Sequence, residues 1–88
     1  MILGRVAGTV VSTIQHPFLN GRRLLLVERI TPAGEPAGGS LIALDAVEAA
    51  EGQTVLVIDE GNSARQILGA PDAPVRSVIV GIVDSVAI

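Results

Sequence analysis

The sequence predicts a mainly all-β protein: a small barrel of five strands with one or two short helical turns. Five apolar segments rich in β-branched residues are separated by stretches rich in glycine, proline and aspartate, a pattern typical of strands joined by turns. Gly4 and Gly8 lie inside the first segment, where glycine indicates a sharp bend or a close approach of backbone. Closing such strands into a barrel removes their exposed edges.

The first two strands are expected at the N-terminal end of the chain. Residues 1–13 form the first strand, and the turn signals His16-Pro17 and Asn20-Gly21 follow it. Residues 23–30 form the second strand, whose middle is apolar on both faces. Such a strand is covered on both sides, by the core and by a second surface.

A loop, a short strand and a turn are expected next. Residues 31–39 (TPAGEPAGG) contain two prolines and three glycines, which predicts a loop. Residues 41–44 form a short third strand. Residues 45–53 fit a single helical turn in which Asp45 is the N-cap and Glu48 its capping-box partner.

The last third of the chain contains the most distinctive stretch. Residues 54–58 predict a buried strand, and a loop of four small residues, 61–64, follows before Arg65. Residues 66–68 fit one helical turn, and residues 76–88 form the last strand. Small side chains allow close backbone approach, so this loop either holds a ligand or meets other copies of the chain.

Composition bounds the class of protein. The 88 residues, 1–88, fit a single small domain, and there is no cysteine for a disulfide or a cysteine zinc site. One histidine cannot form a histidine metal cluster, so oligomerisation is the expected source of additional stability. Apolar residues make up 49% of the chain, and the mean hydropathy is +0.59. Exposed apolar surface of this kind marks interfaces.

Several partners are excluded by the same composition. The net charge is −3, lysine is absent and the one aromatic residue is Phe18, so neither a basic stripe nor stacking aromatics suggest nucleic acid. The longest apolar run, residues 78–83, is far shorter than the roughly 20 residues of a membrane span. No signal peptide is expected, and a cytosolic location fits. Without lysine the chain cannot carry lipoate or biotin, and no cofactor is expected.

Three patterns in the sequence are candidate chemical sites. His16 is a conventional base but lacks an orienting partner nearby, which favours a hydrogen-bonding role at a surface or interface. The sequence Asp59-Glu60-Gly61 is similar to the Asp-x-Gly loop of aspartic proteases, but it lacks the hydroxyl residue and a second copy. The segment 61–65 could be a phosphate nest, but it lacks the Walker lysine and glycine spacing.

Structural roles are therefore favoured for the charged residues. Arg65 offers a fork of donors that suits an acidic group, including one across an interface. Asp45 and Asp84 each follow an apolar segment, where an aspartate satisfies turn amides or an arginine.

Separated segments along the whole chain resemble one family, the pentameric vertex proteins of bacterial microcompartments called EutN/CcmL. The segments that carry the resemblance are Met1–Thr13, His16-Pro17 with Leu19 and Gly21, Leu24–Val27, Ile42–Val47, Gly61–Arg65 and Val80–Asp84. The resemblance implies an OB-like barrel that forms homopentamers in the bacterial cytoplasm. These would cap the five-fold vertices of a shell built from hexameric and trimeric shell proteins, and would not be enzymes.

Residue roles follow from this resemblance as expectations. Gly61, Asn62 and Ser63 are expected near the five-fold axis, where only small side chains fit. Arg65, Asp45 and Asp84 are expected at the subunit interface. The rim that faces the adjoining hexamer is expected to contain His16, Pro17, Phe18, Asn20 and Arg22.

Two other functions are alternatives for a chain of this composition. An OB-like binding module for an oligosaccharide, peptide, oligonucleotide or small molecule would need aromatic side chains on the barrel, and Phe18 alone is available. A small enzyme with sites shared between subunits would need a polar cluster with perturbed acids or bases, which the sequence does not reveal.

Overall fold

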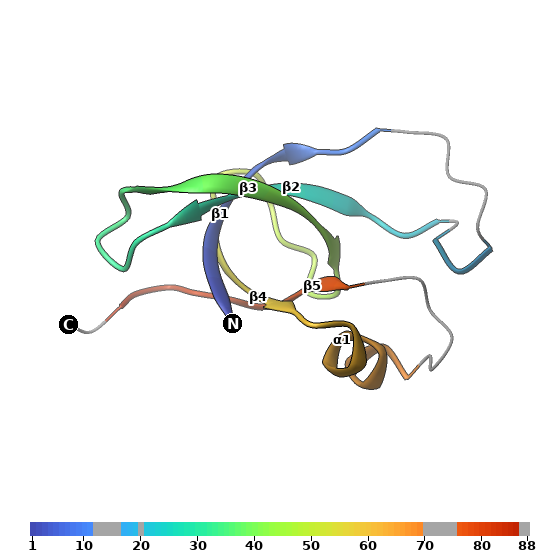
Figure 1. Ribbon diagram of the computed structural model, residues 1–88. Helices are drawn as coiled ribbons and strands as arrows, with labels where there is room; N and C mark the ends of the chain where they lie inside the picture. Colours follow the sequence, from blue (N-terminus) through green and yellow to red (C-terminus); the bar gives the residue numbers. More distant parts are fainter. Residues whose placement is uncertain (12–16, 20, 70–75, 87–88) are drawn as a thin grey trace.

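The computed structural model describes residues 1–11, 17–19, 21–69 and 76–86, and its strands form a closed barrel (Figure 1). The strand order around the barrel is β1-β2-β3-β5-β4, with β3 and β5 parallel and all other neighbours antiparallel. This confirms the predicted five-stranded barrel. The elements are β1 (Ile2–Thr9), the 3₁₀ turn η1 (Pro17–Leu19), β2 (Leu24–Ile30), β3 (Pro36–Asp45), β4 (Thr54–Asp59), α1 (Gly61–Leu68) and β5 (Ser77–Ile82).

Two apolar clusters hold these elements together. The first fills the barrel, and the second joins α1 to β3 and β5. The barrel interior contains Val6, Leu25, Val27, Ala43, Ala49, Val55, Val57 and Ile79, with Ile2, Leu41 and Val47 packed against them. The second cluster contains Leu44, Ala64 and Val78, flanked by Phe18, Leu19, Leu24, Leu68 and Val80. The double-sided apolar character of β2 is thus explained, because Leu25 faces the first cluster and Leu24 the second.

At Gly4, β1 pairs with two strands at once. Its neighbours are Arg29 on β2 and Val55 on β4, so both edges of β1 are paired at this residue. A Cβ atom on Gly4 would collide with the side chain of Val27 and lie 2.9 Å from the carbonyl oxygen of Glu28. The close backbone approach expected at this glycine is present.

β3 is longer than the sequence predicted. The expected loop 31–39 is strand from Pro36 onward, and only residues 31–35 form the turn. Gly38 and Gly39 both have φ +87°, which only glycine adopts freely, and they lie where the register of β3 against β2 shifts. The two strands therefore continue as a ribbon, the β2–β3 ribbon, whose turn is held by a bond from Arg5 Nη2 to the Gly34 oxygen (3.3 Å).

The predicted helical turn at 45–53 is wrong. Asp45 ends β3, and its Oδ1 accepts from the amides of Val47 (3.1 Å) and Ala49 (3.2 Å), as in an Asx-type turn. Glu48 has φ +58°, which is incompatible with a helix and with a capping box. The turn instead brings Ala49 into the barrel interior, where it is fully buried.

The prediction that residues 61–64 form a loop is also wrong, because the helix starts a full turn earlier than expected. α1 begins at Gly61 and not at residue 66, since Glu60 acts as its N-cap in an extended conformation (φ −154°, ψ 124°). Gly69 ends it in the left-handed conformation (φ +65°). β1 and β5 are shorter than predicted, ending at Thr9 and Ile82. No helix in the described residues has the length and apolar character needed to cross a membrane.

Candidate assembly site

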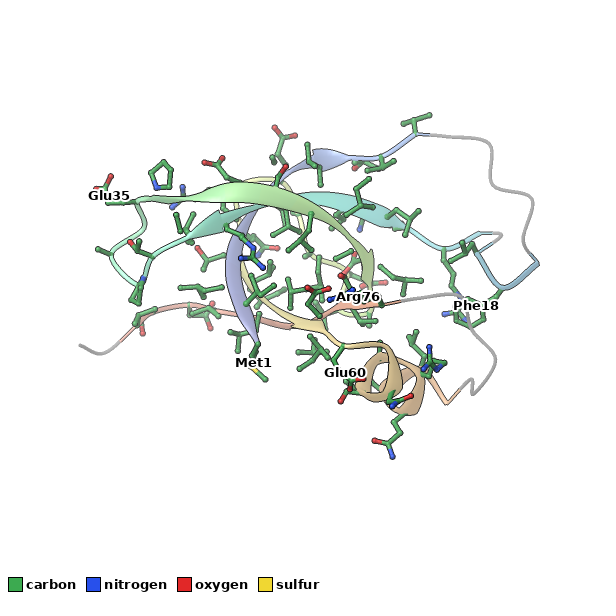
Figure 2. The ribbon with its side chains drawn as sticks, viewed as in Figure 1. Met1, Phe18, Glu35, Glu60 and Arg76 are labelled. Carbon is green, nitrogen blue, oxygen red and sulfur yellow. The ribbon has the colours of Figure 1, made fainter. Side chains whose placement is uncertain are left out.

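The start of α1 is organised by one carboxylate, that of Glu60 (Figure 2). Its Oε1 accepts from the Asn62 amide (2.7 Å), and its Oε2 accepts from the amide (2.8 Å) and hydroxyl (2.6 Å) of Ser63. These bonds, the Ser63 hydroxyl foremost, hold the pKa of Glu60 below its ordinary value of 4.5. The amides of Asn62 and Ser63 are thus occupied by a carboxylate of the chain itself, which argues against the phosphate-nest interpretation.

Arg65 folds back over the same turn. Its Nη2 donates to Asn62 Oδ1 (2.7 Å), and a Cβ atom on Gly61 would lie 3.0 Å from Nη1. Among the described residues Arg65 forms no ion pair. Gly61, Asn62 and Ser63 therefore present a compact helix start, and an acidic partner for Arg65 from another subunit stays a prediction.

The two predicted interface aspartates lie in different surroundings. Asp45 Oδ2 accepts from Arg23 Nη1 at 3.1 Å, and the Asp45 side chain is 1% exposed whereas that of Arg23 is 48% exposed. Asp84 lies beyond the end of β5, where it is exposed. Asp84 is therefore accessible to a neighbouring subunit, whereas the Asp45 side chain is buried and bonded to Arg23, and an interface role for either stays a prediction.

One further charged cluster was missed. Asp59 Oδ1, at the end of β4, accepts from Ser77 Oγ (2.5 Å) and lies 3.3 Å from Arg76 Nε. The partners are separated by a connection that includes α1, so sequence spacing gave no signal for this cluster. The one hint in the sequence is that the predicted strand ends on an aspartate.

The described part of the predicted rim forms a small unit. Arg22 Nε donates to the Phe18 carbonyl oxygen (2.9 Å), and its guanidinium lies 4.1 Å from the centre of the Phe18 ring. Phe18, in η1, also packs against the second cluster, so the rim is fixed relative to α1. Pro17 begins η1, whereas His16 and Asn20 lie outside the described residues.

Apolar side chains also remain on the surface. Leu26 and Ile42 are paired across β2 and β3 and are 38% and 53% exposed. Ile82 and Val86, near the C-terminal end, are 38% and 42% exposed. Beside them a cavity of about 200 Å³ opens at the base of the ribbon turn. It is lined by Leu3, Ile30, Pro32, Ala33, Gly34, Thr54, Val83, Asp84, Ser85 and Val86.

The described residues form turns, helix ends and exposed apolar surfaces, and they bring no reactive constellation together. Within the described ranges no three histidine, cysteine, aspartate or glutamate side chains gather as a metal site would require. The charged groups instead form hydrogen bonds that stabilise turns and helix ends, while large apolar side chains stay exposed. The class of protein that these features define is a self-assembling structural subunit.

Comparisons with known proteins identify the family. The family described as "Ethanolamine utilisation protein EutN/carboxysome" matches residues 1–84. The shell vertex protein PduN of Salmonella typhimurium is 42% identical, with 99% of each chain covered. The carboxysome shell vertex protein CcmL of Gloeobacter violaceus is 40% identical over 100% of this chain and 87% of its own.

Solved structures agree with the sequence comparison. The pentameric microcompartment shell protein GrpN of Rhodospirillum rubrum superposes with a TM-score of 0.88 at 40% identity, covering 100% of this chain and 99% of its own. The structure of Gloeobacter violaceus CcmL superposes with a TM-score of 0.90 at 39% identity, covering 100% and 90%. The chain belongs to the EutN/CcmL family of microcompartment shell vertex proteins. It is a structural shell protein and not an enzyme.

Proposed function

We propose that five copies of this chain form a ring that caps the five-fold vertices of a microcompartment shell. The ring closes a layer built from hexameric and trimeric shell proteins, which supply the flat facets. The observation that carries this proposal is the match over essentially the whole chain to vertex proteins, including a GrpN structure described as pentameric.

The mechanism is geometric. A hexagonal layer is flat, and replacing six-fold tiles by five-fold ones introduces the curvature that lets the layer close. A cyclic ring uses a head-to-tail contact in which two different surfaces of the subunit meet. A specific contact of this kind needs roughly 1,000 Å² or more of buried surface. The exposed apolar residues of the barrel are suited to such a contact, because they would be buried in it.

We assign the start of α1 to the region around the five-fold axis. Five copies crowd there, and the helix start presents Gly61, Asn62 and Ser63, with Arg65 folded back along the helix. Asp84, and Arg23 held by Asp45, are assigned to contacts between neighbouring subunits. The small side chains support the first assignment, and exposure of the charged groups supports the second.

The rim that includes Phe18 and Arg22 is assigned to the contact with adjoining hexamers. The contacts within the rim support this role, because the Phe18 carbonyl oxygen and ring hold the Arg22 side chain in place. His16, Pro17 and Asn20 belong to the same assignment by their position in the chain. The variant Arg22→Glu is expected to form pentamers normally and to reduce shell closure, and Arg22→Gln separates loss of charge from its reversal.

Native mass spectrometry of the purified chain, followed by electron microscopy after mixing with a hexameric shell protein, tests the proposal. A dominant five-mer is expected, with closed particles only when both proteins are present. A chain that stays monomeric or dimeric would contradict the pentamer. Pentamers that never contribute to closed particles would contradict the vertex role.

A further inference from the structure

The outer face of the β2–β3 ribbon has an apolar pair with a free strand edge beside it. Leu26 and Ile42 are cross-strand partners, and both side chains are exposed. β3 pairs with β2 along most of its length but with β5 only at Leu44 and Asp45. From Ser40 to Ala43 the second edge of β3 therefore pairs with no other described strand, and such an edge is a template for another chain.

The residues along this edge favour close approach. Ala37, Gly38, Gly39 and Ser40 are small and exposed, so another backbone can come near without displacing bulky side chains. The bulge at the two glycines limits regular strand pairing to the part that follows. The surface that results, Leu26, Ile42 and the edge 37–43, is called the β3 patch below.

A second surface of matching character lies on a different element, the C-terminal segment of residues 82–86. The amide of Val83 donates to the Thr54 oxygen (2.8 Å), which fastens one side of this segment to the start of β4. Ile82 and Val86 stay exposed along it. Figure 1 shows the segment running below the β2–β3 ribbon, and its residues 83–86 line the cavity together with Ile30 and residues 32–34 of the ribbon turn. None of the residues of the β3 patch lines this cavity, so the patch and the C-terminal segment are different surfaces of the subunit.

Two charged residues border the β3 patch, namely Glu28, which is the half-buried cross-strand partner of Ser40, and the exposed Arg29. Arg29 lies on β2 beside the β3 patch, where its Cδ is 3.9 Å from the position of a Cβ atom on Gly39. Asp84 lies in the middle of the C-terminal segment. Both side chains are exposed, and neither takes part in an ion pair with another described residue. Complementary charges at facing surfaces fix the register of a contact and suppress wrong partners.

We propose that the β3 patch of one subunit packs against the C-terminal segment of the next subunit in the ring, with Arg29 opposite Asp84. The occupant is a second copy of this chain, because a head-to-tail ring requires two different surfaces that complement each other. Leu26 and Ile42 then meet Ile82 and Val86, and the strand edge adds backbone hydrogen bonds. This inference rests on the proposed pentamer and names its subunit contact.

The absence of cysteine makes cross-linking a direct test. Ser40→Cys and Ser85→Cys place one thiol on each surface, at exposed positions and with little change in size. A short bismaleimide reagent spans a thiol pair without requiring the narrow geometry of a disulfide. The double variant is expected to give a ladder of linked species that ends at a covalent pentamer. Each single variant, and a control pair of Ser40→Cys with Gln66→Cys on exposed α1, is expected to give none.

The outcomes separate this contact from the proposed function. A native pentamer of the double variant that gives no ladder, or only links within one chain, overturns the contact and leaves the pentamer intact. Links in the Ser40→Cys variant alone indicate edge-to-edge pairing of identical surfaces and also overturn it. If the unsubstituted chain is itself monomeric, the proposed function fails first.

A charge exchange provides a second, independent measurement. Arg29→Asp and Asp84→Arg are each expected to weaken the pentamer at least about tenfold in the concentration of half-dissociation, since like charges then face each other. Combining them restores opposite charges and is expected to recover most of the loss. Failure of the combined variant to recover assembly beyond the weaker single variant overturns the pairing of these two residues.

Discussion

Arg23 and Asp45 are joined twice, by side chains and by backbone. Arg23 Nη1 donates to Asp45 Oδ2 at 3.1 Å, and the Asp45 amide donates to the Arg23 oxygen at 2.9 Å. The first bond ties the start of β2 to the end of β3, where β3 also meets β5. The carboxylate therefore stabilises the point at which the barrel closes.

Replacing Asp45 is expected to destabilise the barrel strongly. Asp45→Ala leaves the amides of Val47 and Ala49 without their acceptor and removes the partner of Arg23. Loss of partners by buried polar groups costs about 1–3 kcal/mol. Urea unfolding at one fixed subunit concentration measures the change, because an oligomer's apparent stability depends on concentration.

Two companion variants identify which bonds matter. Asp45→Asn keeps an oxygen for the two amides and should retain most of the stability. Arg23→Ala removes a half-exposed partner and is expected to cost less than Asp45→Ala, about 1 kcal/mol or below. Equal losses for Arg23→Ala and Asp45→Ala would show that the ion pair, and not the turn amides, dominates.

Gly4 permits a contact that a larger residue would prevent. Gly4→Ala forces a methyl group against Val27 and the Glu28 carbonyl, inside a well-packed barrel. Overpacking of this kind costs about 1–3 kcal/mol. The melting temperature is expected to fall by about 4–8 °C for each kcal/mol, measured by circular dichroism.

Gly8 on the same strand is the matched control. A Cβ atom at Gly8 would meet no heavy atom within 4 Å, and its backbone does not require glycine. Gly8→Ala should therefore be neutral or slightly stabilising, by at most about 1 kcal/mol, through reduced freedom of the unfolded chain. A loss at Gly8 equal to that at Gly4 would contradict the steric explanation.

The fold was predictable where local pattern and tertiary structure agree. The apolar segments of β2 and β4 and the close backbone approach at Gly4 were visible in the sequence. The ribbon part of β3 was not, because its pairing with β2 overrides the loop-like composition of residues 36–39. Intrinsic preferences are weak compared with such pairing and packing.

The site was predictable in its residue types but not in its contacts. Small residues at 61–64 suggested a loop, since glutamate is not among the preferred N-cap residues and Glu60 gave no helix signal. Its long side chain nevertheless reaches two amides and the Ser63 hydroxyl. The pairing of Asp59 with Arg76 and Ser77 depends on how β4 and β5 align, which spacing along the chain cannot reveal.

Stability of α1 is expected to depend on pH through Glu60. Its pKa is lower in the folded chain because the ionised carboxylate accepts bonds from Ser63 and Asn62. The contribution of Glu60 to stability is therefore complete at pH values above its ordinary pKa of 4.5. It is lost as the pH falls through the lower pKa of the folded chain.

Thermal melts of the wild type and Glu60→Gln, from pH 7 downward, measure this contribution. The wild type is expected to melt at the higher temperature near neutral pH, and the difference should shrink as the pH falls through the folded pKa. Glu51→Gln, in an exposed turn, is a control that should show no such convergence. A wild-type advantage that persists at the lowest pH would contradict the role of the charged carboxylate.

The start of α1 provides a test of the five-fold axis. A tryptophan at position 63 replaces a small side chain with one that five crowded copies cannot accommodate, so Ser63→Trp is expected to abolish the pentamer. Ser63→Ala also loses the hydroxyl bond to Glu60 but adds no bulk, so its pentamer should persist. Asn62→Trp repeats the test at an exposed position where the backbone bonds of the cap remain available.

Native mass spectrometry measures the oligomeric state of these variants, and circular dichroism measures whether they are folded. Folded but monomeric tryptophan variants beside a pentameric Ser63→Ala would place the helix start at a crowded contact. Loss of the pentamer in Ser63→Ala as well would assign the effect to the cap and not to crowding. Intact pentamers in both tryptophan variants would move the axis elsewhere, because five indole rings need room that a closely packed ring centre does not provide.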